Sequence, residues 1–257
     1  MPKGSQNSRM SRKAKQELSM SRNVDKKVSF LNNEQDYKLD WFIPTQDQSK
    51  IVESMQTNLV TVVQAPSGCG KSATAMWAAL KEYRVDATKK ILLVKNPTEV
   101  GDDALGFLKG DEQEKLGPHV ESMKTIFAQF MGKNKLENDL SSGNIKIGIP
   151  NFYLGQTLDN TIILIEEAQT MSPPTLKLMM ERAGTNSKVV VLGDSKQTYS
   201  IKKRPNGLAD LINRITYDNH GIRLPNVNMP VGYIEMDSNN NKRSDLSKWV
   251  TDLYDDL

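Results

Sequence analysis

Eight consecutive residues, Ala65–Ser72, carry the residue types from which a phosphate-binding loop is built. The segment reads Ala-Pro-Ser-Gly-Cys-Gly-Lys-Ser. Gly68 and Gly70 permit the backbone N–H groups to turn inward around an anion. Lys71 can reach the β- and γ-phosphates of a nucleotide, and the hydroxyl of Ser72 can ligate Mg²⁺. The spacing therefore predicts a P-loop that binds a nucleoside triphosphate together with Mg²⁺.

The whole loop and the first turn after it are expected to contact the nucleotide. The residues expected there are Pro66, Ser67, Gly68, Cys69, Gly70, Lys71, Ser72 and Ala73. Ala65 stands where a P-loop usually has its first glycine, and alanine tolerates most turns. Cys69 is interpreted as a small packing residue rather than a redox switch. The alternative is a glycine turn that only connects a strand to a helix.

Two adjacent carboxylates, Glu166 and Glu167, follow the apolar run Ile162–Ile165. A strand that delivers two acids at its C-terminal end suits hydrolysis beside a P-loop, because one acid supports Mg²⁺ and the other polarises the attacking water. We assign the first role to Glu166 and the second to Glu167. The first position is usually aspartate, and the extra methylene of Glu166 moves its carboxylate outward by about one bond length. The alternative is a solvated strand end.

A third polar turn, containing Asp194 and Gln197, follows the apolar run Lys188–Leu192. Ligands of parallel sheets bind at the C-terminal edge, where this turn would lie. Asp194 is expected in the nucleotide site, and Gln197 is expected to sense the γ-phosphate or to orient water. A Gly-Asp pair after a strand is by itself only a turn, but its position after the two glutamates favours the functional interpretation.

Gln48 lies 23 residues before Lys71. A glutamine there can bond the adenine edge with both its amide N–H and its C=O, which favours ATP over GTP. The alternative is a helix that begins here and is capped by Thr45, and both interpretations can hold together.

A mainly parallel sheet would bring these groups to one edge. Apolar, β-branched runs predict strands at 59–63, 91–94, 145–149, 162–165, 188–192 and 231–236. Helices are predicted at 73–83, 113–132, from 173 onward, at 207–215 and at 246–253, with loops at 141–144 and 237–241. Continuous apolar strands that alternate with helices indicate an α/β fold with helices on both faces of the sheet.

The 257-residue chain is expected to hold one domain, residues 30–257, behind a basic arm, residues 1–29. Its apolar share of 37% and charged share of 25% are typical of a soluble, cytoplasmic protein. No apolar run approaches the roughly 18–20 residues of a membrane span, so no membrane partner is expected. One cysteine and two histidines exclude an internal disulfide and a cysteine- or histidine-rich metal site.

The arm carries a charge opposite to that of the rest of the chain. Eight Lys and Arg side chains against Glu17 and Asp25 give residues 1–27 a net +6, whereas the whole chain carries +3, so the remaining residues sum to −3. Such a segment is expected to be disordered and could attract RNA, single-stranded DNA or another polyanion. The alternative is a solvated leader without a partner.

The P-loop, the Glu-Glu strand, the Asp194 turn and Gln48 together resemble the first motor domain of superfamily 1 helicases. Further segments narrow the resemblance to the PhoH family of ATPases over roughly residues 44–250. These segments are 96–101, 105–111, 114–119, 155–158, 181–184 and 206–208. The short length, without an added RNA-binding or nuclease domain, resembles the phage-encoded members.

The resemblance implies a RecA-like ATPase associated with RNA or phosphate-stress physiology, in a bacterial or phage-infected cytoplasm. This chain departs from the family where Glu166 replaces Asp, where Asn96 replaces Arg beside Lys95, and where Leu154 replaces Arg. The departures motivate the alternative of an ATP-dependent switch or binding protein with little turnover. A small-molecule kinase is disfavoured, because the chain has no arginine-rich lid.

We therefore predict a nucleic-acid-associated ATPase with a single RecA-like domain. A superfamily 1 motor needs two such domains, so strand separation by a monomer is not expected. Self-association into a homo-oligomer could place an arginine of one subunit against the ATP of the next, and the candidates are Arg182 and Arg204.

Overall fold

The computed structural model describes residues 36–86, 88–96, 112–197, 206–217 and 230–253. The predicted arm at 1–29 and Arg204 lie outside these residues. None of the helices described is long and apolar enough to cross a bilayer.

Six parallel strands form one sheet. They are β1 (Val60–Gln64), β2 (Lys90–Lys95), β3 (Ile145–Gly148), β4 (Thr161–Glu166), β5 (Lys188–Gly193) and β6 (Val231–Glu235). Their order across the sheet is β3-β2-β4-β5-β1-β6. Because β5 pairs with both β1 and β4, its C-terminal end lies between the loop that follows β1 and the acids that follow β4. All six predicted strands are confirmed, with ends that differ by a residue or so.

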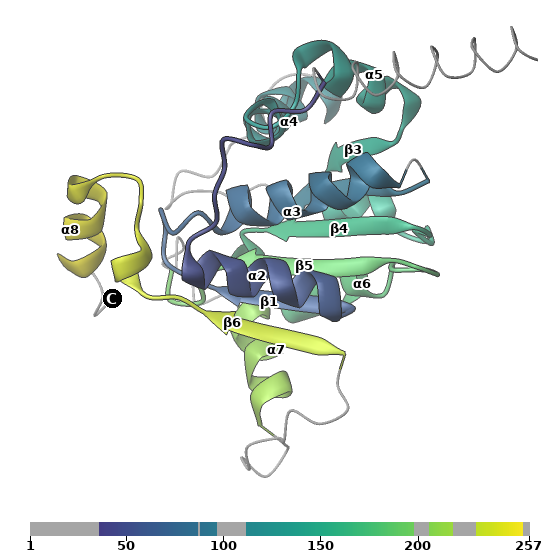
Figure 1. Cartoon of the computed structure of the whole chain (residues 1–257). Helices are drawn as coiled ribbons and strands as arrows, with labels where there is room; N and C mark the ends of the chain where they lie inside the picture. The colour runs from purple at the N-terminus through teal and green to yellow at the C-terminus, as the bar shows by residue number, and fades with distance from the viewer. Residues whose placement is uncertain (1–35, 87, 97–111, 198–205, 218–229, 254–257) are drawn as a thin grey trace, which may run out of the picture.

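Seven helices among the described residues accompany the sheet. They are α2 (Gln46–Thr57), α3 (Lys71–Val85), α4 (Glu112–Ala128), α5 (Lys133–Ser142), α6 (Pro173–Met180), α7 (Gly207–Thr216) and α8 (Asp245–Leu253). Helices α2 and α3 cover one face of the sheet, and α6 and α7 cover the other (Figure 1). Helix α8 stands at the side of the molecule beyond the C-terminal end of β6 (Figure 1). This two-faced α/β arrangement is the predicted one.

The alternation of side chains along each strand builds two cores. In β2, Ile91 and Leu93 pack with the helices on the α2 and α3 face, whereas Leu92 and Val94 pack with those on the α6 and α7 face. Every one of these four side chains is at most 1% exposed. Burial on both faces explains why the strands are continuously apolar, and each such side chain contributes about 1.5–3 kcal/mol to folding.

The predicted helix over 113–132 is wrong at its end, and the helix after it was not predicted. Helix α4 ends at Ala128, and Gly132 is the N-cap of α5 rather than a stop signal. The Phe130 carbonyl accepts from the N–H of Lys38, and the Gly132 N–H donates to the Asp36 carbonyl. The helix breaks because this backbone pairs with a segment about 90 residues earlier in the chain. Helix α5 also replaces the start of the loop expected at 141–144.

Candidate nucleotide-binding site

The loop between β1 and α3 has the backbone conformation that the sequence predicts. Gly68 and Gly70 both adopt positive φ, at 84° and 76°, which favours glycine. Helix α3 begins at Lys71, and its N-cap Gly70 provides no side-chain cap for the first turn. The N–H groups of that turn therefore have no capping side chain and form, with the positive end of the helix dipole, a site suited to an anion.

Lys71 and Ser72, the first two residues of α3, lie beside the loop. The Lys71 side chain is buried, and its Nζ donates to the carbonyl of Pro66 at 3.3 Å, so the cation lies against the loop itself. The Ser72 hydroxyl donates to Oε2 of Glu166 at 2.8 Å. These contacts bring the predicted loop and the predicted metal ligands into one site.

Glu166 ends β4 and is only 5% exposed. Burial raises the pKa of its carboxyl group, while the hydrogen bond from Ser72 and the nearby charge of Lys71 work in the opposite direction. Carboxylate and hydroxyl oxygens are ligands that Mg²⁺ prefers. The direct contact between Ser72 and Glu166 therefore gives a donor set that suits this ion, with phosphate and water oxygens left to complete it.

Glu167 turns the chain away from the strand. Its φ of 51° lies in the left-handed region, a conformation that costs a non-glycine residue of order 1 kcal/mol. The N–H and hydroxyl of Thr170 both donate to the Glu167 carbonyl, at 2.9 and 2.7 Å, and hold this turn. The Glu167 carboxylate accepts a hydrogen bond of 2.6 Å from Nε2 of Gln169. The side chain expected to act as a base is thus held in place by a neighbour that the sequence did not single out.

A chain of amide and carboxylate groups joins three strand ends. Oε1 of Gln169 accepts from the Asp194 N–H at 3.2 Å, and Oδ1 of Asp194 accepts from Nε2 of Gln64 at 3.0 Å. Gln64 in turn accepts from the Ser195 N–H at 2.9 Å. The chain runs from Glu167 after β4, through Asp194 after β5, to Gln64 at the end of β1. It couples the predicted base to the strand that leads into the P-loop.

Gln64 and Gln169 are the functional candidates that sequence reasoning missed. One signal in the sequence pointed to Gln64. It is the last residue of β1, whose other residues are valine and threonine, and it alone among them carries a side-chain amide. Gln169 follows the two glutamates within three residues. Both are at least 93% buried, and the part of the chain described contains no buried side-chain polar atom without a hydrogen bond.

Gln48 is buried against the P-loop and caps its own helix. Its Oε1 accepts from the Thr45 N–H at 3.0 Å, and Thr45 accepts in return from the Gln48 N–H, so the predicted cap is confirmed. Its Nε2 donates to the carbonyl of Cys69 at 3.1 Å. Gln48 therefore braces the loop, a role not expected from the sequence, and its contact with adenine stays a prediction.

Cys69 is fully buried within the loop. Burial raises the pKa of its thiol, which keeps it protonated and unreactive near neutral pH. This placement agrees with the packing role expected for it.

The remaining candidates occupy two turns. The Gln197 N–H donates to the carbonyl of Asp194 at 3.1 Å, so Gln197 closes the turn after β5. Arg182 follows α6 and donates to the carbonyls of Leu178 and Gln156, at 3.2 and 3.4 Å. Asn96 donates to the carbonyl of Thr170 and ties the end of β2 to the turn that holds Glu167.

A P-loop after β1, acids after β4, and β5 inserted between these two strands define an α/β fold of the RecA-like P-loop NTPase class. The family model described as "PhoH-like protein" matches residues 43–255. The chain therefore belongs to the PhoH family.

Curated relatives are consistent with this membership. The chain is 30% identical over 167 residues to a PhoH-like protein of Bacillus subtilis, covering 65% of this chain and 52% of that protein. It is 29% identical over 174 residues to Protein PhoH of Escherichia coli K12, covering 66% and 47%. The chain thus spans about half the length of these relatives.

Among solved structures, the Hef helicase domain of Pyrococcus furiosus is similar with a TM-score of 0.43 and 15% identity, over 78% of this chain and 40% of that one. The Pif1 helicase of Candida albicans is similar with a TM-score of 0.36 and 12% identity, over 76% and 40%.

Proposed function

We propose that this chain binds ATP with Mg²⁺ at the P-loop and hydrolyses it. The observation that carries the proposal is the contact between the Ser72 hydroxyl and the Glu166 carboxylate, directly beside a loop with two positive-φ glycines. Two oxygen atoms of the kind that Mg²⁺ prefers therefore lie beside a loop of the shape that suits a phosphate, which supports the proposal. Bound Mg²⁺ would neutralise charge on the phosphates, and Ser72 and Glu166 would hold it.

Each predicted residue receives a role in this proposal. Residues Pro66–Ala73 contact the phosphates through their backbone N–H groups, and Lys71 moves from the Pro66 carbonyl to the β- and γ-phosphates. Glu167 accepts a proton from the attacking water, while Gln169 fixes its orientation. Gln197 and Asp194 lie on the turn after β5, where Gln197 can sense the γ-phosphate. Gln48 selects adenine. A competition titration of ATP against GTP tests this role, and ATP should bind more tightly.

The test of hydrolysis is the rate of phosphate release by the purified chain. We expect Mg²⁺-dependent turnover that disappears with a chelator, because the metal neutralises charge on the transferring phosphoryl group. Absence of turnover together with tight ATP binding would contradict hydrolysis and leave the alternative of an ATP-dependent switch. The observation that favours this alternative is the longer, buried Glu166 in place of aspartate. Glu166→Asp should preserve or raise turnover if the chain is an ATPase.

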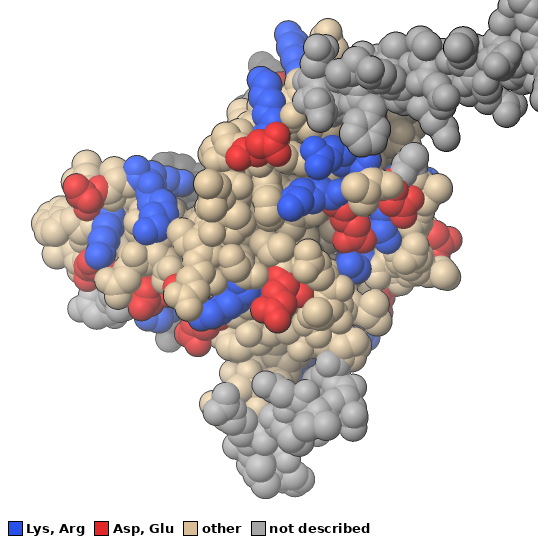
Figure 2. All heavy atoms as spheres, in the orientation of Figure 1, with Lys and Arg blue, Asp and Glu red and all other residues tan. Residues whose placement is uncertain are grey.

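We further propose that the chain associates with RNA or single-stranded DNA through the basic segment 1–27. On the face drawn in Figure 2, acidic and basic side chains of the described residues are interspersed without a large patch of either sign. The support for the proposal is therefore the net +6 of the segment itself. Deleting residues 1–27 should weaken oligonucleotide binding, and the salt slope should fall by about 0.7 for every phosphate that the segment no longer neutralises. Equal affinities and slopes for the two proteins would overturn it.

The last part of the proposal is that the protein is cytoplasmic and associates with further copies of itself. Helix α8 exposes four large apolar side chains, Leu246, Trp249, Val250 and Leu253, each more than 40% exposed. On another side of the molecule, α6 and α7 border a groove of about 840 Å³ that includes Glu181, the neighbour of Arg182. Both surfaces favour association, which could place Arg182 or Arg204 against the nucleotide of a second copy.

An arginine supplied in trans can accelerate hydrolysis by about 10³–10⁵. Turnover per chain should then rise with protein concentration, in parallel with the molar mass measured by light scattering. A monomer with constant specific activity at all concentrations would exclude this part of the proposal.

A further inference from the structure

The four consecutive carbonyl groups of Pro66, Ser67, Gly68 and Cys69 each accept a hydrogen bond from outside the turn that they form. Lys71 and Gln48 supply the donors to Pro66 and Cys69. The donors to the two middle carbonyls come from the far end of the chain. Nδ2 of Asn241 donates to Ser67 at 3.2 Å, and the N–H of Lys242 donates to Gly68 at 2.9 Å.

The segment Asp237–Lys242, which we name the C-terminal brace, reaches the loop by extending β6. The Met236 N–H donates to the Gln64 carbonyl at 2.9 Å, where β1 ends. The Sγ atom of Cys69 lies 3.4 Å from the Asp237 carbonyl, and a single 3₁₀ turn, Ser238–Asn240, then brings Asn241 onto the loop. The sequence predicted only a loop here.

The fit between Asn241 and the loop is close. A Cβ atom placed on Gly68 would lie 2.4 Å from Oδ1 of Asn241. Gly68 is therefore required for two reasons, its φ of 84° and the approach of this side chain. The contact is specific to Asn241, since the side chain of the neighbouring Asn239 bonds Asp237 and Lys248 instead.

Asn241 is in turn fixed by α8 and by the backbone two residues further along the chain. Its Nδ2 also donates to the hydroxyl of Ser247 at 3.1 Å, in the first turn of α8. Its Oδ1 accepts from the N–H of Arg243 at 2.9 Å. Both polar atoms of the side chain are thus used, and the amide cannot rotate without losing several hydrogen bonds at once.

The direction of these hydrogen bonds has a consequence for the loop. In a turn of this kind, carbonyls that are held on the outside leave the N–H groups on the inside, where a phosphate binds. A loop fixed in this shape before the ligand arrives loses less conformational entropy when it binds. We propose that Asn241 is a positioning residue of the nucleotide site, and that its side chain and the N–H of Lys242, at the end of the C-terminal brace, hold the P-loop in its anion-binding conformation. This inference rests on the proposed binding of ATP.

The test compares Asn241→Ala with Asn239→Ala in the full chain. Loss of the Asn241 side chain should raise the Kd for ATP with Mg²⁺ and the Kd for ADP alike, each by about 3- to 10-fold, the effect of one hydrogen bond. Turnover at saturating ATP should stay within about 2-fold of wild type. Asn239→Ala should leave both Kd values unchanged. A purely structural role would instead lower the melting temperature and leave nucleotide affinity intact.

Two further variants keep the inference open to refutation. Asn241→Asp retains the acceptor for Arg243 but loses the donor to Ser67, so it should weaken binding at least as much as Asn241→Ala. Ser247→Ala should weaken binding less, and its effect should vanish in the Asn241→Ala background, because it acts through Asn241.

A second measurement does not need nucleotide. Amide hydrogen exchange of the P-loop in the ligand-free protein should be faster in Asn241→Ala than in Asn239→Ala. Unchanged Kd values and unchanged exchange would overturn the inference while leaving ATP binding by the wild-type chain in place. If the wild-type chain bound no ATP, the proposed function would fail. Equal amide exchange in the two variants would then also contradict the proposal that Asn241 holds the P-loop in shape.

Discussion

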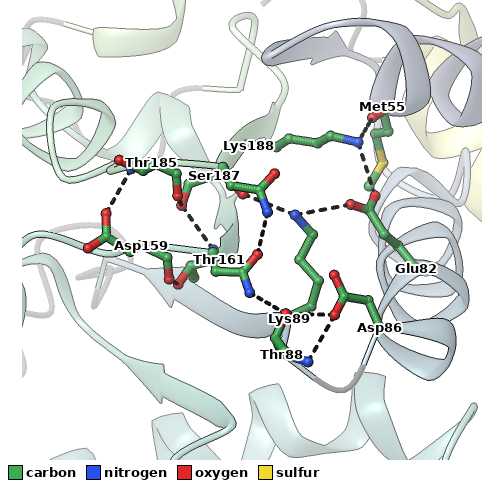
Figure 3. A network of polar contacts seen from close by, with 12 residues as sticks. Met55, Glu82, Asp86, Thr88, Lys89, Asp159, Thr161, Thr185, Ser187 and Lys188 are labelled. Atoms are coloured by element: carbon green, nitrogen blue, oxygen red, sulfur yellow. Dashed lines mark hydrogen bonds and ion pairs between the residues drawn. The ribbon is translucent and has the colours of Figure 1, made fainter.

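Both ends of the sheet carry polar side chains, and they differ in whether any backbone N–H groups remain without a side-chain partner. At the N-terminal ends of β2, β4 and β5, the buried Lys89 and the half-buried Lys188 bond to carbonyls and to a carboxylate of the protein (Figure 3), and the buried hydroxyl of Ser187 bonds to a carbonyl. At the C-terminal ends, the side chains are also paired, yet the P-loop and the start of α3 present N–H groups without a side-chain cap. A polar cluster alone is therefore not a reason to propose a site, whereas a helix start without a side-chain cap, beside two adjacent glutamates, is the basis of the proposed one.

The N-terminal end forms a network centred on Glu82 and Ser187. Glu82 pairs with Lys188 at 3.1 Å and with Lys89 at 3.5 Å, and both lysines also donate to backbone carbonyls (Figure 3). Ser187 donates to the Leu158 carbonyl and accepts from the Thr161 N–H. Each group in this network has a protein partner, so the network serves to hold the strand starts together.

The largest expected difference between the two ends comes from Glu167→Gln. This substitution keeps the shape of the side chain and removes the base, so turnover should fall by about two orders of magnitude or more while ATP binding persists. The measurement is phosphate release at saturating ATP, with Glu82→Gln as the matched variant at the other end of the sheet. If Glu167→Gln kept the turnover of the wild type, Glu167 would not be the general base, and another residue would have to fill that role.

Gln169→Leu is expected to have the next largest effect. The substitution removes the donor to Glu167 and leaves the Asp194 N–H without its acceptor, so kcat should fall by about 10-fold. The free energy of unfolding should also fall, by about 1–3 kcal/mol, because a buried N–H is left unpaired. Gln56→Leu, at an exposed position of α2, is the control. A kcat that equals that of the control would show that Gln169 does not orient the base.

Glu82→Gln is expected to act on stability alone. It removes the partner of two lysines, one of them with a side chain only 5% exposed, and should lower the free energy of unfolding by about 1–2 kcal/mol. Turnover per folded chain should not change. Urea denaturation measures the effect, with Glu121→Gln, from the more exposed Glu121–Lys124 pair, as a control expected to cost at most about 0.5 kcal/mol. If Glu82→Gln lost activity without losing stability, the N-terminal end of the sheet would not have the purely structural role assigned to it.

Local patterns were enough to predict the fold class and the strand ends that carry the candidate site. The P-loop, the two glutamates and the Thr45 cap are encoded within short stretches, and a parallel sheet brings strand ends together wherever they lie in the sequence. The strand order then places Ser72 against Glu166, residues that are 94 positions apart.

The features that sequence reasoning missed depend on tertiary pairing. Helix α5 begins where it does because the backbone at Gly132 pairs with Asp36. The hydrogen bond from Gln64 to Asp194 can be inferred only once β5 is known to lie beside β1. Asn241 bonds a carbonyl 174 residues away, across a segment that looked like an ordinary polar loop. No local periodicity reports such contacts.

The central claim is that the P-loop end of the sheet binds ATP, and calorimetric titration of the full chain with ATP and Mg²⁺ tests it most directly. Wild type should bind one ATP per chain. Lys71→Ala should lose at least about 100-fold in affinity, because charge-assisted hydrogen bonds to two phosphates, about 1.5–3 kcal/mol each, are removed. Circular dichroism should show that the variant remains folded. Equal affinities of wild type and a folded Lys71→Ala, or no binding by wild type, would contradict the account.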